Sequence, residues 1–187
     1  VIKNNLIISI SREHGTNGKE IAKQVANILN IKFYDKEEIK EFAIKNGLID
    51  NDYSNKDIYD NFLSLDVNKE AIINQTKVIK KIANNSNAII VGRASDYILR
   101  DNTNLIKIFI YDTLDYRVKN IMNNYGDNQK QALKNILNSD KSRSNYYSAI
   151  SSKKWGEKNN YDLYIDATIE NKNVVKTICD YINKKCW

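Results

Sequence analysis

The residues with the most evident chemistry lie in the stretch SREHGTNGKEIA, at positions 11–22. Its two glycines, Gly15 and Gly18, separate a short apolar run from a segment with helical periodicity. A glycine-containing turn between a buried strand and a helix directs several backbone N–H groups at one point, where the helix N-terminus adds partial positive charge. The stretch therefore predicts a phosphate site, with these candidate residues: Arg12, Gly15, Thr16, Asn17, Gly18, Lys19 and Glu20.

The stretch departs from the common phosphate-loop pattern of glycine, four residues, then Gly-Lys-Ser/Thr. Aligning Gly18 and Lys19 with that pattern places Glu13 at the first glycine and Glu20 at the hydroxyl position. Shifting the alignment by one residue places Gly18 where the lysine belongs. Taken alone, the stretch is equally compatible with an ordinary turn between a strand and a helix.

The strands expected around this loop are short apolar runs at 6–11, 32–35, 88–92, 105–111 and 161–167. Each is followed by a longer helical or polar segment, and the apolarity within each run is largely continuous. Continuous apolarity is typical of strands buried on both faces, as in a parallel sheet with helices on either side. We expect a single α/β domain over residues 1–187, since no repeat or Pro/Ser-rich linker interrupts the chain.

Apolar spacing predicts helices at 18–29 and 69–83, a third beginning near Asp112 or Thr113, a fourth at about 129–137 and a last at about 174–182. In each of the first three helices, recurring apolar residues are expected to face the core. They are Ile21, Val25, Ile28 and Leu29, then Ile72, Val78, Ile79 and Ile82, then Val118, Ile121 and Met122.

Composition narrows the possible partners and compartment. The apolar runs are far shorter than the ~20 residues of a membrane helix, and no charged-then-apolar leader opens the sequence, so we expect a cytoplasmic protein without membrane contact. Cys179 and Cys186 lack CxxC spacing and His14 is the single histidine, which argues against a zinc site. The net charge of +6 favours anionic ligands, but basic residues alternate with acidic ones and no nucleic-acid-reading motif is present.

Several stretches occur in the order and spacing of a known family: SREHGTNGKEIA, FYDKE, VGRASDYIL, DKSRSNYY and KKWG. Together they resemble the bacterial cytidylate kinase-like family over nearly the whole chain. The resemblance implies a three-layer α/β sandwich of the P-loop nucleoside monophosphate kinase type. That fold has a five-stranded parallel sheet and a helical lid segment, here at about 125–158.

The resemblance also implies roles for particular residues. It implies a kinase that moves the ATP γ-phosphoryl, with Mg²⁺, to a nucleoside monophosphate such as CMP or dCMP or to another small acceptor. Residues 15–19 would bind the donor, and Lys19, Arg117 and Arg143 would be catalytic. The residues expected at the acceptor are Asp35, Lys36, Arg93, Asp140, Lys141 and Arg143. Arginine suits this task because its planar fork binds phosphate oxygens two at a time.

Each of these residues also has a structural interpretation. Arg93 can be a surface residue beyond a strand, Arg117 can pair with acids on its own helix, and Lys141 and Arg143 can form a solvated charge run. Tyr146 and Tyr147 can be structural or can stack on a base. The KKWG stretch can anchor the lid or contact ligand.

The departures from true cytidylate kinases fall on catalytic positions. Lys19 or Glu20 occupies the place of the magnesium-binding Ser/Thr, Val91 replaces an Asp before Gly-Arg, and Glu41 replaces an arginine of the acceptor helix. Glu20 is a possible metal ligand, Lys19 or Arg12 a possible phosphate cation, and Lys36 or Lys40 a possible acceptor contact. A catalytically impaired nucleotide- or phosphate-binding regulatory module is therefore the alternative, with a nucleic-acid-binding protein third. The acceptor and the oligomeric state are left open.

Overall fold

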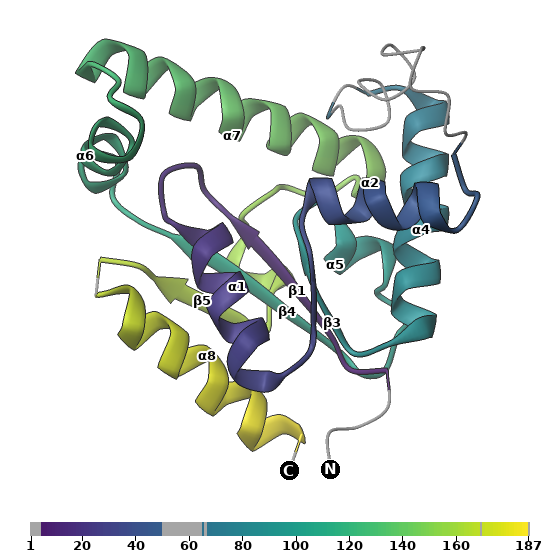
Figure 1. Ribbon diagram of the computed structural model, residues 1–187. Coiled ribbons are helices and arrows are strands. Elements are labelled where there is room, and N and C mark those ends of the chain that lie inside the picture. Colours follow the sequence, from purple (N-terminus) through teal and green to yellow (C-terminus); the bar gives the residue numbers. More distant parts are fainter. Residues whose placement is uncertain (1–4, 50–64, 66, 169, 187) are drawn as a thin grey trace.

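The computed structural model describes residues 5–49, 65, 67–168 and 170–186, and its centre is a five-stranded parallel sheet in the order β2-β3-β1-β4-β5 (Figure 1). The strands are β1 Ile7–Arg12, β2 Lys32–Tyr34, β3 Ala88–Val91, β4 Leu105–Tyr111 and β5 Leu163–Asp166. Their positions confirm the expected apolar runs and the three-layer α/β fold. In the central strand, Ile10 pairs with Val91 on one side and Ile108 on the other.

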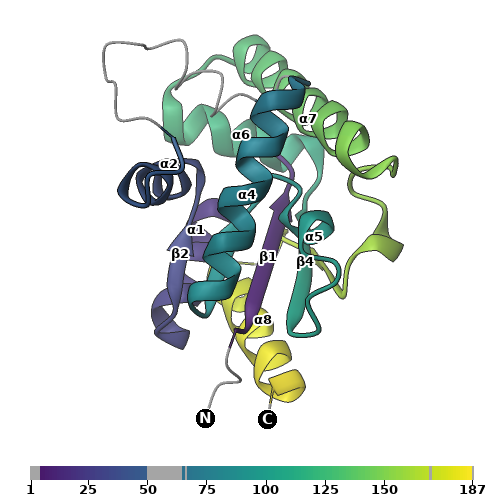
Figure 2. The same ribbon diagram turned by 90° about the vertical axis from the view of Figure 1, so that its right-hand side faces the viewer.

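Helices cover both faces of the sheet because successive strand residues point to opposite faces. Ile8 and Ile10 pack into one core cluster with α1 (Gly18–Leu29) and α8 (Asn171–Cys186). Ile7 packs into the other cluster with α2 (Lys36–Lys45), α4 (Lys69–Asn85) and α5 (Ser95–Ile98). Figure 2 shows α4 lying in front of β1, on the side away from α8.

The remaining helices are α6 (Leu114–Tyr125), α7 (Gln129–Ser151) and the 3-10 turn Lys158–Asn160. Helix α7 fills most of the expected lid segment and lies across the end of the sheet where the strands terminate (Figure 1). None of the helices in the described part of the chain is long and apolar enough to cross a membrane.

The expected end of the fourth helix at residue 137 is wrong, since α7 continues to Ser151. The stretch NSDKSRSNYYS, which follows residue 137, is rich in residues of modest helix propensity and has no aliphatic residues at helical spacing. No glycine or proline interrupts it, a capping box of Asn128 and Gln131 starts the helix, and the buried Tyr146 and Tyr147 hold its far end.

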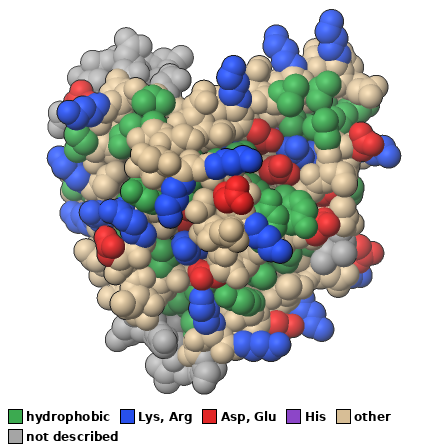
Figure 3. Space-filling model, turned by 180° about the vertical axis from the view of Figure 1, so that it is seen from behind, with side chains coloured by type: hydrophobic (Ala, Val, Ile, Leu, Met, Phe, Trp, Pro, Cys, Tyr) green, Lys and Arg blue, Asp and Glu red, His purple; other side chains and the backbone are tan. Residues whose placement is uncertain are grey.

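Two of the residues expected in the core are exposed. Ile28 is 63% exposed because the buried stripe of α1 runs through Ile21, Ala22, Val25 and Ala26. Met122 is 36% exposed, since α6 packs against α7 through Val118 and Ile121 instead. Hydrophobic side chains consequently gather on the surface over α6 and α7 (Figure 3), where Leu114, Met122 and Leu133 lie.

Candidate active site

Two adjoining cavities lie at the carboxyl ends of the strands, where ligands bind in open parallel sheets. The first, called here the inner cavity, has a volume of about 260 Å³ and is enclosed by the ends of β1, β2 and β3 and by α7. The second, the loop cavity, has a volume of about 380 Å³ and surrounds the turn between β1 and α1. Both are lined by the same cations, called here the shared cations: Arg12, Lys19, Lys36 and Arg143.

The start of α1 opens onto the loop cavity. Its N-cap residue, Asn17, has left-handed backbone geometry and makes no side-chain cap hydrogen bond. In contrast, α2, α4, α6 and α7 are each capped by a side chain. The first-turn amides of a helix have no intrahelical acceptor, and Gly18, Lys19 and Glu20 line the loop cavity. An anion at this position would supply the missing cap.

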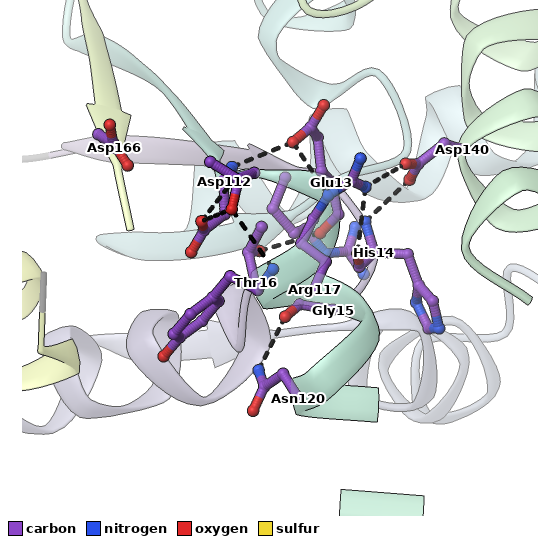
Figure 4. Close-up of polar contacts among 12 residues, drawn as sticks. Glu13, His14, Gly15, Thr16, Asp112, Arg117, Asn120, Asp140 and Asp166 are labelled. Atoms are coloured by element: carbon purple, nitrogen blue, oxygen red, sulfur yellow. Dashed lines mark hydrogen bonds and ion pairs between the residues drawn. The ribbon is translucent and has the colours of Figure 1, made fainter. Parts of the chain in front are cut away.

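The turn at residues 13–17, called here the phosphate loop, is held by hydrogen bonds from several elements (Figure 4). Thr16 is buried and its hydroxyl donates to the Glu13 carbonyl at 2.9 Å. Asn120 of α6 donates its amide to the Gly15 carbonyl at 2.7 Å. Gly15 has a φ of +89°, and a Cβ atom there would lie 2.9 Å from the Arg117 carbonyl oxygen. Only glycine fits this turn against α6.

A network of charges behind the loop connects it to α6 and α7 (Figure 4). The Arg117 guanidinium lies 2.6 Å from the Asp140 carboxylate and 3.5 Å from that of Glu13. Asp140 also accepts the His14 backbone N–H at 2.8 Å. Burial raises the pKa of Glu13, while the Asp112 amide and Arg117 lower it. Arg117 therefore pairs with acids from two other elements rather than from its own helix.

Asp140 also orients Arg143, the cation that α7 contributes to both cavities. Arg143, one turn further along α7, lies 3.4 Å from Asp140 and donates to the Arg12 carbonyl at 3.3 Å. Burial lowers the pKa of Arg143 and nearby Asp140 raises it. Asp140 is thus the link between the phosphate loop and the arginine that α7 presents to the site.

Asp35 begins α2 at the wall of the inner cavity. Its side chain accepts the Glu37 amide at 2.8 Å and the Glu38 amide at 3.4 Å, and the Glu38 carboxylate accepts the Asp35 amide in return, which completes a capping box. Its second oxygen is in an ion pair with Lys19. Burial alone would raise the pKa of Asp35, but hydrogen bonds from Glu38, Lys19 and the Glu37 amide hold it well below its usual range. Asp35 is therefore ionised and engages the Lys19 ammonium.

The end of β3 supplies the opposite wall through an unusual backbone. Gly92, Arg93 and Ala94 have φ values of +74°, +58° and +52°. Left-handed geometry costs a residue with a side chain about 1 kcal/mol, so the fold maintains this turn against local preference. The turn brings Arg93 into the inner cavity, where burial lowers its pKa and nearby Arg143 lowers it further.

Aromatic residues close the inner cavity from the side of α7. Tyr146 donates its hydroxyl to Gln75 at 2.9 Å, and Tyr147 donates to Asp96 at 2.8 Å. Trp155, from KKWG, packs edge-on against Phe109 of β4 and also lines the cavity. The tyrosine hydroxyls are structural, and Trp155 both anchors this segment and contacts the cavity.

A metal would find few protein ligands here. In the described ranges, no group of three or more His, Cys, Asp or Glu side chains is arranged to hold an ion. Glu13 and Glu20 are the carboxylates among the described residues lining the loop cavity. Magnesium commonly uses one or two carboxylates, several waters and substrate phosphates. The donor set fits a magnesium ion that arrives with a polyphosphate better than one bound permanently.

A family model covers most of the chain that builds this site. Residues 7–169 match the model of the cytidylate kinase-like family. The chain belongs to this family. No curated protein matches the sequence.

Solved structures share the fold of this cytidylate kinase-like protein. An uncharacterized protein from Eubacterium ventriosum is 32% identical, with a TM-score of 0.79 and coverage of 96% of this chain and 99% of that one. Shikimate kinase from Aquifex aeolicus is 16% identical, with a TM-score of 0.53 and coverage of 96% and 97%. A gluconokinase from Sinorhizobium meliloti is 9% identical, with a TM-score of 0.56 and coverage of 96% and 92%. The fold is therefore that of the P-loop kinases.

Most residues expected at the site of this kinase-like protein do line the two cavities. Among the residues that the structure describes, Arg117, Asp140 and Lys141 line neither, although they were expected at the reacting groups. Arg117 and Asp140 pair with each other behind the loop, and Lys141 is exposed on α7. Their contacts indicate positioning roles for Arg117 and Asp140.

Sequence reasoning missed Asn120 and Asn124 of α6. Asn124 donates to the Asn17 side chain at 3.2 Å, next to the bond from Asn120 to Gly15. The signal was available, because Arg117, Asn120 and Asn124 recur at the spacing of one polar helix face.

Proposed function

We propose that this protein is an ATP-dependent phosphotransferase whose donor occupies the loop cavity and whose acceptor occupies the inner cavity. The observation that carries the proposal is that the two cavities meet at the shared cations. Phosphoryl transfer requires two anionic groups to be held together and demands little covalent chemistry from the protein. Cations at the junction of two cavities satisfy that requirement.

On the donor side, the uncapped start of α1 and the glycines of the phosphate loop would bind the ATP phosphates through backbone N–H groups. Lys19 adds positive charge there. Glu20, exposed on the first turn of α1, would be the protein ligand for a magnesium ion that arrives with ATP. The ion would neutralise charge on the phosphates during transfer.

On the acceptor side, Arg93, Arg143 and Lys36 would hold an anionic group, proposed as the phosphate of a nucleoside monophosphate such as CMP or dCMP. Asp35 is ionised and would repel a phosphate, so it suits a hydroxyl of the acceptor sugar. The rings of Tyr146, Tyr147 and Trp155 offer an apolar wall for a base. Asp140 would act through Arg143 rather than on the acceptor itself.

Helix α7 contributes to the reaction by its position above both cavities. It supplies Arg143 to the junction and covers the inner cavity with its aromatic residues. Excluding water from the junction favours transfer to the acceptor over hydrolysis and strengthens the electrostatic contacts there.

The second candidate function is a regulatory module that binds nucleotide or phosphate without turnover. It is favoured by the ion pair that engages Lys19 with Asp35, and by Val91 at the place of a metal-ordering carboxylate. A nucleic-acid-binding role is less well supported. On the face seen in Figure 3, acidic side chains are interspersed with the basic ones.

The test is an assay of ADP formation with Mg²⁺, ATP and a panel of nucleoside monophosphates and small hydroxylated acids. A kinase gives magnesium-dependent ADP with at least one acceptor. The regulatory module gives an ATP-induced rise in melting temperature but no ADP with any acceptor. If the protein forms no ADP and ATP does not raise its melting temperature, both functions are refuted.

A further inference from the structure

Arg12 is the last residue of β1 and lies where the loop cavity and the inner cavity join. We infer that Arg12, rather than Lys19, is the catalytic residue that neutralises the transferred phosphoryl group. This inference rests on the phosphotransferase function proposed above and assigns the cation that the variant phosphate loop lacks.

The side chain of Arg12 is fixed by two glycines on neighbouring elements. A Cβ atom on Gly18, at the start of α1, would lie 2.7 Å from the Arg12 Cγ atom. A Cβ atom on Gly92, at the end of β3, would lie 2.7 Å from the Arg12 Nη1 atom. The stem therefore passes over Gly18 and the guanidinium lies against Gly92. Gly18 does not have positive φ, so the space for Arg12 is a sufficient reason for glycine there.

The other three shared cations are already engaged by carboxylates. Lys19 pairs with Asp35, Arg143 with Asp140, and Lys36 with Glu37. Within the described ranges, the Arg12 guanidinium has no ion pair or hydrogen bond, and the bond from Arg143 goes to the Arg12 backbone carbonyl. Its charge is left for a ligand.

The Arg12 charge is also removed from water, which makes it favour an anionic ligand. Burial, together with nearby Arg143 and Arg93, lowers the pKa of Arg12 to about 9, so it is still protonated at neutral pH. Asp35 and Asp140 oppose this shift only in part. A desolvated cation without an ion pair is unfavourable, and a phosphate bound between Arg12, Arg93 and Arg143 would relieve that cost. The geometry thus favours an anion that spans both cavities, as a phosphoryl group does during transfer.

The transfer step itself is balanced without any further reactant. The bond between the γ-phosphorus and the oxygen bridging to the β-phosphate breaks, and its electron pair stays on that oxygen as ADP leaves. An acceptor oxygen forms the new bond to phosphorus, and a hydroxyl acceptor releases its proton to solvent. Arg12 would donate N–H groups to the oxygens on which charge accumulates, an interaction that strengthens in the transition state.

The test compares Arg12→Lys with Lys19→Met in ADP formation and in MgATP binding by calorimetry. Arg12→Lys should lower kcat about 100-fold or more with a much smaller change in MgATP affinity, since the fork is lost and the charge is kept. Lys19→Met should lower kcat by less than about tenfold. Near wild-type kcat in Arg12→Lys, or loss of turnover in Lys19→Met alone, would overturn the inference.

A second variant, Gly18→Ala, keeps Arg12 but changes its position. Comparing it in two backgrounds separates an effect on catalysis from an effect on folding. Gly18→Ala should displace the Arg12 stem and lower kcat in the wild-type background, but should have little effect in an Arg12→Gly background, where the Cβ and Cγ atoms that the new methyl group would meet are both absent. Equal effects of Gly18→Ala in both backgrounds would also overturn the inference. Wild-type protein that forms no ADP with any acceptor would instead refute the proposed function, and the catalytic role with it.

Discussion

Arg117 of α6 and Asp140 of α7 form an ion pair at 2.6 Å, and the same carboxylate accepts the His14 amide of the phosphate loop at 2.8 Å. Both side chains are largely buried, at 10% and 19% exposure. One carboxylate therefore joins two helices to the loop, so a change in the position of α7 is coupled to the shape of the proposed donor site.

Replacing Asp140 with Ala should destabilise the fold and weaken MgATP binding. The change removes the acceptor of the His14 amide and leaves Arg117 with Glu13 as its only acidic partner among the described residues. Breaking one side of a largely buried pair should lower the free energy of unfolding by roughly 2–4 kcal/mol, measured by urea unfolding. Lys141→Ala, one residue away and exposed, is the control and should change it by less than about 0.5 kcal/mol. Equal losses in the two variants would contradict the coupling.

Gly15→Ala should be more damaging than Gly126→Ala, although both glycines have positive φ, +89° and +74°. Gly126 has no atom within 4 Å of an added Cβ, so only backbone strain of about 1 kcal/mol applies. At Gly15 the added atom also meets the Arg117 carbonyl at 2.9 Å and must displace α6 or the loop. Thermal unfolding with and without MgATP measures both effects. If MgATP raises the melting temperature of Gly15→Ala as much as that of the wild type, the phosphate loop does not need glycine at position 15 to bind its ligand, and the prediction is wrong.

Tyr147→Phe and Tyr146→Phe form a matched pair, because each removes one buried hydroxyl and keeps the ring. The Tyr147 hydroxyl donates to the Asp96 carboxylate and that of Tyr146 to the neutral Gln75. Loss of the bond to a charged group should cost about 1.5–3 kcal/mol, and loss of the neutral one about 0.5–1.5 kcal/mol. Urea unfolding at neutral pH gives both values. Similar costs would indicate that Asp96 is protonated in the folded protein.

The cost of Tyr147→Phe should also depend on pH. Burial raises the pKa of Asp96, while the bond from Tyr147 opposes the rise, so the variant raises that pKa further. Stability from a group with a raised folded-state pKa is present below its unfolded value, about 4 for Asp, and is lost as the pH rises through the folded value. The stability difference between wild type and Tyr147→Phe should therefore widen as the pH rises from about 4 to 7. A difference that is constant over this range would rule out titration of Asp96.

Asp35 should show the opposite pH dependence. Its folded-state pKa is held well below the usual range, so its contribution is present above about pH 4 and is lost as the pH falls through the folded value. At pH 7, Asp35→Ala should cost about 1–2 kcal/mol, mostly from the lost helix cap, because Lys19 is half-exposed and its ion pair adds little. Asp35→Asn keeps a capping oxygen and should cost less. Unfolding measured at pH 7 and pH 3 should show the deficit of Asp35→Ala shrinking at the lower pH, and a growing deficit would contradict the ionised Asp35.

The sequence was sufficient to predict the sheet and most of the residues around the two cavities. Continuous apolar runs such as LIISI are buried on both faces, and residues that follow such strands must meet at one edge of a parallel sheet. Arg12 is the last residue of β1, Asp35 directly follows β2, and Arg93 follows β3 after one glycine, so their convergence follows from local pattern alone.

The charge network around Asp140 and Arg117 could not be predicted from local sequence patterns. Asp140 meets the amide of His14 at a separation of 126 residues, and Arg117 meets Glu13 across two elements. Such pairings depend on where α7 crosses the sheet, which in turn depends on a helix that the polar stretch after residue 137 does not indicate. The engagement of Lys19 by Asp35, and the absence of such a partner for Arg12 in the described chain, likewise arise only when β1, β2 and β3 are brought together.

The decisive measurement follows the γ-phosphoryl group of ATP by phosphorus NMR, in the presence of Mg²⁺, wild-type protein and each acceptor of the panel. Transfer at the shared cations predicts that, with one acceptor, ADP and phosphorylated acceptor accumulate in equal amounts and little inorganic phosphate appears. ATP signals that shift on binding but are never consumed, or ADP matched only by inorganic phosphate with every acceptor, would contradict transfer between the two cavities.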